Sequence, residues 1–224
     1  PYRPKRRTRA MIAKEKGLEP LADLLAAQGA EKPEEAAAQF LAGRSVSGAS
    51  DKSELHALSV DDALAGARDI VAERVADNAD IRGLVRHAFA TQAKVVSEVV
   101  TPKPAEPTKF EQYYDFSEPI AAMPSHRFLA IRRGQKEGVL LVRLVAESAP
   151  LLVRMEDLAG LKPASPWAPQ LRLAVADAYK RLVAPSCEID VMVEKKLESD
   201  RAAVEVFAEN LRHLLLSAPL GEKA

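Results

Sequence analysis

The sequence is poor in residues that could carry covalent or metal chemistry. Cys187 is the single cysteine among 224 residues, so no internal disulfide can form. This cysteine usage is typical of the reducing cytoplasm, which is the location we expect. The four histidines, His56, His87, His126 and His213, show no metal-ligand spacing with one another or with Cys187. We therefore expect neither a metal site nor a bound cofactor.

The signature motifs of common enzyme classes are also missing. The chain has neither a G-x-G-x-x-G nor a Walker phosphate loop, and no G-x-S-x-G nucleophile elbow. Ser125 and His126 are adjacent and could suggest a serine nucleophile with its base. In the extended segment that we expect here, neighbouring side chains point to opposite faces, so they would not form a dyad. We interpret them as a turn that enters a strand, and we expect no enzymatic activity.

Aromatic residues make up only 5% of the sequence, whereas alanine and leucine are abundant. This composition favours a core of packed helices. No apolar run approaches the roughly 20 residues that a membrane-spanning helix needs, so we expect no membrane partner. The predicted fold class is mainly α, a multi-helix array with a small antiparallel β-hairpin at about residues 127–145.

Apolar spacing and capping residues predict helices over most of residues 1–100. Ser59 and Asp62 have the spacing of a capping box at the start of one helix. Asn78 is expected to cap the next helix, whose apolar stripe continues as far as Val99. Shorter helices are predicted to begin near Thr8, at Glu19 and at Pro33, with Gly17, Gly29 and Gly43 after their ends.

Residues 101–126 form a predicted linker, because TPKPAEPT contains three prolines in eight residues. The β-prone runs 128–133 and 139–145 follow, separated by a five-residue connection with two glycines that is typical of a hairpin. Residues 150–154 could supply a third strand, and the sequence leaves this open.

Residues 146–224 are predicted to be helical again. Ser165 is expected to begin a helix that Pro185 ends, and a shorter helix follows it. Ser199 or Asp200 would cap the final helix, in which one face carries Val204, Phe207, Ala208, Leu211, Leu214 and Leu215.

Positive charge is concentrated at the beginning of the chain. Residues 1–16 contain seven basic side chains and one acid, a net charge of +6 that the remainder of this neutral chain must balance. Such clusters bind nucleic-acid phosphates without sequence preference. A solvated end, or a segment that pairs with acidic helices of the same protein, is the competing interpretation. The candidate contacts are the arm residues Arg3, Lys5, Arg6, Arg7 and Arg9 and the hairpin residues Arg132, Arg133 and Lys136.

Four aromatic residues lie within seven positions of the linker and could stack on bases beside the hairpin cations. We favour the other interpretation, in which they pack the linker against neighbouring elements, because clustered aromatics dominate core energetics. These residues are Phe110, Tyr113, Tyr114 and Phe116.

Three separated segments resemble one family, the bacterial transcription accessory protein Tex. The opening PYRPKRRTRAMIAKEKGLEPLA is similar to the family's Y-K-P-K-R-R-T-basic-A stretch. FEQYYDFSEPIAAMPSHRFLAIRRGQKEGVL resembles its D-Y-F-D-F-S-E-P, P-S-H-R and A-I-x-R-G-x-x-E-G-V-L signature, which is the most specific match. AVEVFAENLRHLLLSAPLGEKA resembles the helix that precedes the family's RNase H-like domain.

The resemblance implies a piece of a longer, multi-domain protein that ends just before the RNase H-like domain. Proteins of this family bind nucleic acid without being enzymes, carry helix-hairpin-helix motifs and a C-terminal OB-fold RNA-binding domain, and are described as having a helix-turn-helix element. It also implies a non-enzymatic helical scaffold that contacts RNA or DNA, with RNA polymerase or other transcription proteins as further partners. The alternative is a protein–protein docking module for the transcription machinery that makes no direct nucleic-acid contact.

Overall fold

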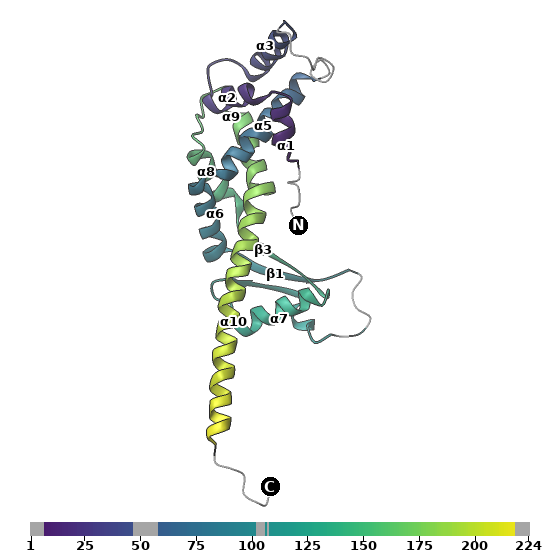
Figure 1. Ribbon diagram of the computed structural model, residues 1–224, viewed down its shortest axis with the longest axis vertical. Coiled ribbons are helices and arrows are strands. Elements are labelled where there is room, and N and C mark those ends of the chain that lie inside the picture. The colour runs from purple at the N-terminus through teal and green to yellow at the C-terminus, as the bar shows by residue number, and fades with distance from the viewer. Residues whose placement is uncertain (1–6, 47–57, 102–105, 107, 218–224) are drawn as a thin grey trace, which may run out of the picture. The chain divides into compact units, whose positions relative to one another are not determined.

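The protein is described by a computed structural model (Figure 1). The structure describes residues 7–46, 58–101, 106 and 108–217. Its contacts separate two compact units, Pro1–Val85 with Glu147–Ser186 (unit 1) and Arg86–Ala146 with Cys187–Ala224 (unit 2). Helices predominate and a small antiparallel sheet accompanies them, which confirms the predicted fold class.

Unit 1 is built around α5 (Val60–Asp77), the most deeply buried helix of this unit. The predicted capping box is present at its start: Ser59 Oγ accepts the Asp62 N–H at 3.1 Å, and Asp62 Oδ2 accepts the Ser59 N–H at 3.3 Å. Apolar residues at helical spacing, including Leu64, Ala67 and Val71, are buried. Packed against α5 are α1 (Arg9–Glu15), α2 (Glu19–Ala27), α3 (Pro33–Val46) and α9 (Ala168–Asp177).

The N-terminal helices begin where the sequence predicts. Thr8 Oγ1 accepts the Met11 N–H at 3.1 Å and caps α1, and Gly17 adopts a positive φ of 69° after its end. Helix α3 differs from the prediction, because it continues through Gly43 to Val46. A glycine inside a helix costs only about 1 kcal/mol relative to alanine, so it does not compel a stop.

A buried glutamine ties distant segments of unit 1 together. Gln28 ends α2 in the left-handed region, with φ 54°. Its Nε2 donates to the Gly160 carbonyl at 2.9 Å, and its Oε1 accepts the Lys162 N–H at 2.8 Å. Both contacts fix the segment that follows α8 (Ser148–Leu158). Residues 150–154 lie in α8, so they supply no third strand.

Unit 2 contains a three-stranded antiparallel sheet in the order β2-β1-β3. The strands are β1 (Lys94–Val99), β2 (Asp115–Pro119) and β3 (Leu140–Val145). Central β1 pairs Ser97 with Phe116 on one side and with Val142 on the other. Helix α7 (Ser125–Lys136) packs on β3 and buries Phe128, Ile131 and Gly134 (Figure 1).

The predicted hairpin at residues 127–145 is therefore wrong, although its second strand, 139–145, is confirmed as β3. Residues 128–133 lie in α7 instead. Phe128, Ile131 and Gly134 recur every three residues, which suits a helix packed on one face rather than a strand. Gly138 ends the turn that leaves α7 with φ 74°, and the Val139 N–H donates to the Gly134 carbonyl at 3.0 Å.

The predicted helix from Asn78 to Val99 is wrong in its last third. Helix α6 (Ala79–Gln92) stops, and β1 begins at Lys94. Valines at 95, 96 and 99 fit both periods at once, because helical and strand spacings coincide over so short a run. Pairing with strands on both sides decides the outcome, and it buries Val95 and Ser97.

Pro185 does not end a helix as predicted. A π-helical turn, η2 (Ala178–Val183), joins α9 directly to α10 (Ala184–Leu216), so Ser199 and Asp200 lie inside a continuous helix. The Ala184 N–H donates to the Tyr179 carbonyl, five residues back. We attribute the tolerance of Pro185 to this wider turn, because proline in regular α geometry collides with the carbonyl four residues earlier.

Gly134 allows α7 to approach the sheet closely. A Cβ at this position would lie 2.6 Å from Leu140 Cδ1, 2.9 Å from Leu140 Cγ and 3.1 Å from Phe110 Cδ1. We expect Gly134→Ala to lower the free energy of unfolding by about 1–3 kcal/mol, as overpacking of a close-packed core does. Urea denaturation followed by circular dichroism measures the change.

The matched control is Gly83→Ala in α6, where a new Cβ meets nothing within 4 Å. Alanine there should leave stability unchanged or raise it by about 0.5–1 kcal/mol. Equal effects of the two substitutions would show that the contact between Gly134 and Leu140 does not constrain α7.

Candidate nucleic-acid interface

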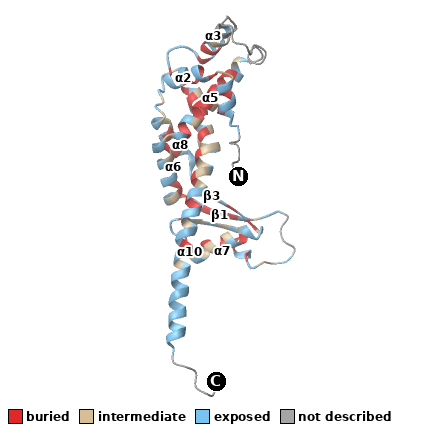
Figure 2. Cartoon of the chain, viewed as in Figure 1, coloured by how far each residue is buried: buried red, intermediate tan, exposed pale blue. Residues whose placement is uncertain are grey.

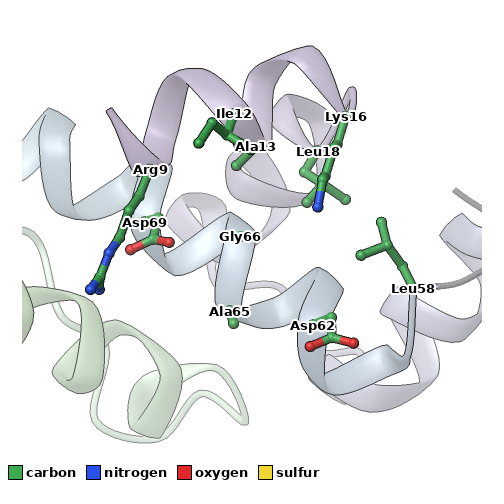
Figure 3. Close-up of a pocket in the computed structure, with 10 residues that line it drawn as sticks. All are labelled: Arg9, Ile12, Ala13, Lys16, Leu18, Leu58, Asp62, Ala65, Gly66 and Asp69. Carbon is green, nitrogen blue, oxygen red and sulfur yellow. The ribbon is translucent and has the colours of Figure 1, made fainter. Parts of the chain in front are cut away.

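The basic arm is only partly within the described residues. Arg3, Lys5 and Arg6 lie outside them. Arg7 donates to Glu15 on α1 in an exposed ion pair, so a carboxylate already offsets its charge. Arg9 is exposed and lines a groove between α1 and α5 (Figure 3).

That groove, with a cavity volume of about 420 Å³, carries opposed charges. Arg9 and Lys16 come from the α1 side, and Asp69 and Asp62 come from α5. Burial raises the pKa of Asp69, while the positive charges of Arg181 and Arg9 oppose this rise. Because the groove holds two carboxylates beside its two cations, we consider this surface a poor one for a phosphate backbone.

Helix α7 presents the other predicted cations, and its charges are arranged differently. Its twelve residues include no acid, and Arg133 and Lys136 lie in its last turn, where cations are favoured by the helix dipole. Both are exposed, and among the described residues neither forms an ion pair. Arg132 is half-buried and donates to the amide oxygen of Gln135, an uncharged partner. We call Arg132, Arg133 and Lys136 the α7 cation cluster.

The fourth cation of α7 has a structural role. Arg127 Nη1 donates to Glu118 Oε1 on β2 at 2.7 Å. This hydrogen bond and the charge of Glu118 raise the pKa of Arg127. The pair attaches the start of α7 to the neighbouring strand, so we do not include Arg127 in the cluster. Sequence reasoning did not find this pair, because no local spacing connects the two residues.

The packing of α7 decides which way the cluster points. Phe128, Ile131 and Gly134 are buried on the sheet side of the helix. Arg132, Arg133 and Lys136 occupy other positions around the helix and are at least partly exposed. Just beyond the helix, Glu137 accepts a hydrogen bond from Lys109 Nζ at 2.8 Å, so this adjacent carboxylate is already paired.

A groove with a cavity volume of about 440 Å³ lies between α7 and α10. Ser125, His126 and Arg133 line it beside apolar residues, Val206 among them. Ser125 and His126 occupy the first turn of α7, so our expectation of a turn entering a strand is wrong. In a helix, adjacent side chains diverge by about 100° and still do not face one another.

The aromatic cluster of the linker is packed rather than displayed. Phe110 and Tyr113 are buried, and the Tyr113 and Phe116 rings meet edge to face with centroids 5.5 Å apart. The Tyr114 hydroxyl lies 2.8 Å from Thr108 Oγ1. Ser97 on β1 donates to the Tyr113 carbonyl at 2.5 Å. These contacts support the packing interpretation over a base-stacking surface.

Other kinds of site find no support in the part of the chain that the structure describes. No group of three or more histidine, cysteine, aspartate or glutamate residues within it could hold a metal ion. Cys187 is buried, as expected for a lone structural cysteine. None of the helices within the same residues is both long and apolar enough to cross a membrane.

Comparison of the sequence with known proteins identifies its family. Residues 28–207 match the model of a family described as Tex central region-like. The chain belongs to the Tex family. It is 36% identical to "Protein tex" of Bordetella pertussis over 236 residues, 38% identical to "Transcriptional accessory protein Tex" of Neisseria gonorrhoeae over 228, and 39% identical to "Protein YhgF" of Escherichia coli over 237.

These alignments cover 99–100% of this chain but only 28–29% of each relative. The chain therefore spans less than a third of the length of the Tex proteins that it matches. A more distant match is the human "S1 RNA-binding domain-containing protein 1", which is 27% identical over 169 residues, or 69% of this chain and 17% of the relative.

The capping box beside the α1–α5 groove gives a pH-dependent prediction. Hydrogen bonds from Ser59 lower the pKa of Asp62, and Lys16 adds a smaller effect. A lowered folded-state pKa stabilises the fold above the ordinary carboxyl pKa, and this contribution is lost as pH falls through the lowered value. Ser59→Ala should therefore reduce the melting temperature at pH 7, and the difference from the unsubstituted chain should shrink towards pH 2.

Thermal unfolding of both proteins across this pH range measures the difference. Thr8→Ala is the matched control, because Thr8 caps α1 through its hydroxyl alone and no acidic residue lies in the first turn of that helix. A melting-temperature difference for Ser59→Ala that stays constant with pH would show that the Asp62 carboxylate contributes nothing to the cap.

Proposed function

We propose that this chain is a non-enzymatic helical scaffold of a cytoplasmic transcription accessory factor, and that it contacts RNA or DNA through basic side chains. The observation that carries the proposal is the α7 cation cluster. Arg133 and Lys136 are exposed without carboxylate partners among the described residues, so their charge is available to phosphates. Of the other described candidates, Arg7 pairs with Glu15, and Arg9 lines a groove that also holds Asp62 and Asp69.

The names of the relatives support a nucleic-acid role. One similar protein is named a transcriptional accessory protein, and a more distant one is named for an S1 RNA-binding domain. The chain aligns with less than a third of its Tex relatives, so we propose that it contributes supporting contacts to a larger binding surface. RNA polymerase or another transcription protein would be a further partner of the whole protein.

The chemistry of the cluster favours contacts to the phosphate backbone. Arginine and lysine on one helix end bind phosphate oxygens whatever the base sequence, and they release counterions as they do so. Phe110 and Tyr113 are buried and Phe116 packs edge to face on Tyr113, so we do not propose that these aromatics read unpaired bases. We therefore propose sequence-independent, salt-sensitive binding, to which Arg3, Lys5 and Arg6 of the arm would add.

The test is a triple substitution of Arg132, Arg133 and Lys136 by glutamine. We expect affinity for single-stranded RNA, single-stranded DNA and duplex DNA to fall by roughly tenfold or more at low salt. The slope of log affinity against log salt should become shallower by about 2–3 for duplex DNA, because each lost phosphate contact removes about 0.9. Fluorescence anisotropy at several salt concentrations measures both quantities.

The control removes the same charge elsewhere, from Arg154, Lys180 and Arg212, which are exposed. It should lower affinity only slightly, through the change in net charge. If both triple variants behave alike, the α7 cluster is not the contact surface. If the unsubstituted chain binds none of the three probes at low salt, direct contact is excluded.

The second candidate function is a protein–protein docking module that makes no nucleic-acid contact. The observation in its favour is the sheet surface opposite to the buried one, where Leu141 and Val145 of β3 remain about half exposed, at 48% and 51%. Absence of nucleic-acid binding, together with a partner that is retained after nuclease treatment, would favour this function over the first.

A further inference from the structure

The groove between α7 and α10 has the composition of a ligand-binding site. Both helices contribute to unit 2, and the cavity volume is about 440 Å³. Three polar side chains, those of Ser125, His126 and Arg133, line it among apolar ones. Pockets for small ligands share this size and this mixture, in which a few polar groups orient a ligand on an apolar surface. We call this site the α7–α10 groove.

One face of α7 forms the first wall of the groove. His126, Leu129, Ala130 and Arg133 follow one another at intervals of three, one and three residues, so they share a side of the helix. His126 and Arg133 are seven residues apart, which is about 10.5 Å along the helix axis. The wall therefore presents an apolar middle with a hydrogen-bonding side chain at each end.

Alanines leave the space between the two helices open. Ala130 lies on α7, and Ala202 and Ala203 lie opposite on α10. About one turn before these alanines, Ser199 is 0% exposed, so α10 is still closely packed there. About one turn after them, Val206 is 60% exposed, and Figure 2 shows α10 in the exposed colour beyond this point. The groove therefore opens where the packing of α10 against the rest of unit 2 ends.

The polar side chains of the groove can all donate hydrogen bonds, and one carries a fixed positive charge. The Arg133 guanidinium has five N–H donors, and the Ser125 hydroxyl and the His126 ring add further donors. Within the part of the chain that the structure describes, none of these three side chains has a hydrogen bond or an ion pair. No carboxylate of the same residues lines the groove. The groove thus offers donors and positive charge without an opposing acid.

The acids of α10 that lie near the groove in sequence are paired or line another surface. Asp200 Oδ2 lies 2.5 Å from Lys196 Nζ on the same helix. Glu209 Oε1 lies 3.8 Å from His213 Nε2, and Glu205 lines a separate groove. Charge complementarity therefore favours a ligand that is anionic and also has an apolar part.

A nucleotide within a single strand has these properties. Its phosphate is anionic, and its unstacked base offers an apolar face together with hydrogen-bond acceptors at its edge. Arg133 belongs both to the α7 cation cluster and to the groove, so a strand that contacts the cluster can continue into the groove. We propose that the α7–α10 groove holds one unpaired nucleotide of a strand whose neighbouring phosphates contact the α7 cation cluster.

This inference rests on the function proposed above and adds a preference for single strands. A duplex, whose major groove alone is about 12 Å wide, does not fit into a cavity of about 440 Å³. It would therefore contact the cluster without entering the groove. Strandedness separates the two sites, because a change in the groove should affect single strands alone.

Ala203→Glu tests the proposal, because it places a carboxylate in the groove and reduces its volume. Ala203 is exposed, and glutamate is a good helix former, so helix content by circular dichroism should not change. We expect the affinity for single-stranded RNA and single-stranded DNA to fall by about tenfold at low salt, and that for duplex DNA by about twofold or less. Fluorescence anisotropy with oligonucleotides of equal length measures these affinities.

The matched control is Ala208→Glu, the same substitution at an exposed alanine of α10 that does not line the groove. It should lower the affinity for each of the three probes by about twofold or less, because only the net charge changes. Equal losses of single-strand affinity in the two variants would overturn the groove site, while glutamine substitution of the α7 cation cluster still decides the proposed function. If the unsubstituted chain binds no probe, both proposals fail.

The second test identifies the occupant of the groove directly. Single-stranded RNA that contains 4-thiouridine is irradiated in complex with the whole chain, and the peptides that carry a nucleotide are identified by mass spectrometry. We expect adducts within residues 125–133 or 202–206, and their loss in Ala203→Glu but not in Ala208→Glu. Adducts confined to other peptides would overturn the groove site even where the chain binds RNA, and would leave the groove to a protein segment.

Discussion

The arrangement of unit 2 depends on the pairing of β1 along both of its edges. Strands β2 and β3 are each antiparallel to β1, so they run in the same direction as one another. A tight turn cannot join two strands that point the same way, because the chain must first return along the sheet. Residues 125–136 make that return as α7. No hairpin forms, because the segment immediately before β3 is helical and β3 pairs with β1 instead.

The same crossover places the cation cluster at its position. Helix α7 must bury one side on the sheet, and Gly134 sets how closely it does so. The remaining sides carry charge, and the last turn, where the negative end of the helix dipole lies, holds Arg133 and Lys136. Some described cations elsewhere have carboxylate partners, as Arg74 does with Asp23 at 2.6 Å and Arg181 with Asp177 at 2.5 Å. Available positive charge is thus a consequence of topology as well as of composition.

Local chemistry was predictable from the sequence, and non-local pairing was not. The Ser59–Asp62 capping box, the Thr8 cap and the start of α3 at Pro33 were identified because each depends on residues within one turn. The sequence predicts a helix over residues 94–99 because the valines there satisfy both periods, and only the strands on either side select one. Pro185 predicts a helix end because the sequence carries no signal for the π-helical turn that accommodates this proline.

The candidate site shows the same division. Arg132, Arg133 and Lys136 were identified as basic residues of interest, but they were assigned to a strand, so the direction in which they point was unknown. The carboxylates near Arg7 and Arg9 could not be identified from the sequence. They depend on the position of Glu15 and on the contact between α1 and α5. Arg127 resembled the other α7 cations in sequence, and only the position of Glu118 on β2 distinguishes it. Charge composition identifies candidate residues, and tertiary contacts determine which of them remain available.

The exposed surface of α10 is apolar in part, so charge composition does not identify it. Its polar sides are satisfied internally, because Lys195 and Lys196 pair with Glu198 and Asp200 within one turn. Such pairs stabilise a helix without help from tertiary packing. The apolar side cannot be satisfied in this way, because an apolar side chain has no local partner that removes it from water. The exposed apolar side chains of α10, such as Phe207 and Leu214, are therefore the part of this helix that its own sequence cannot satisfy.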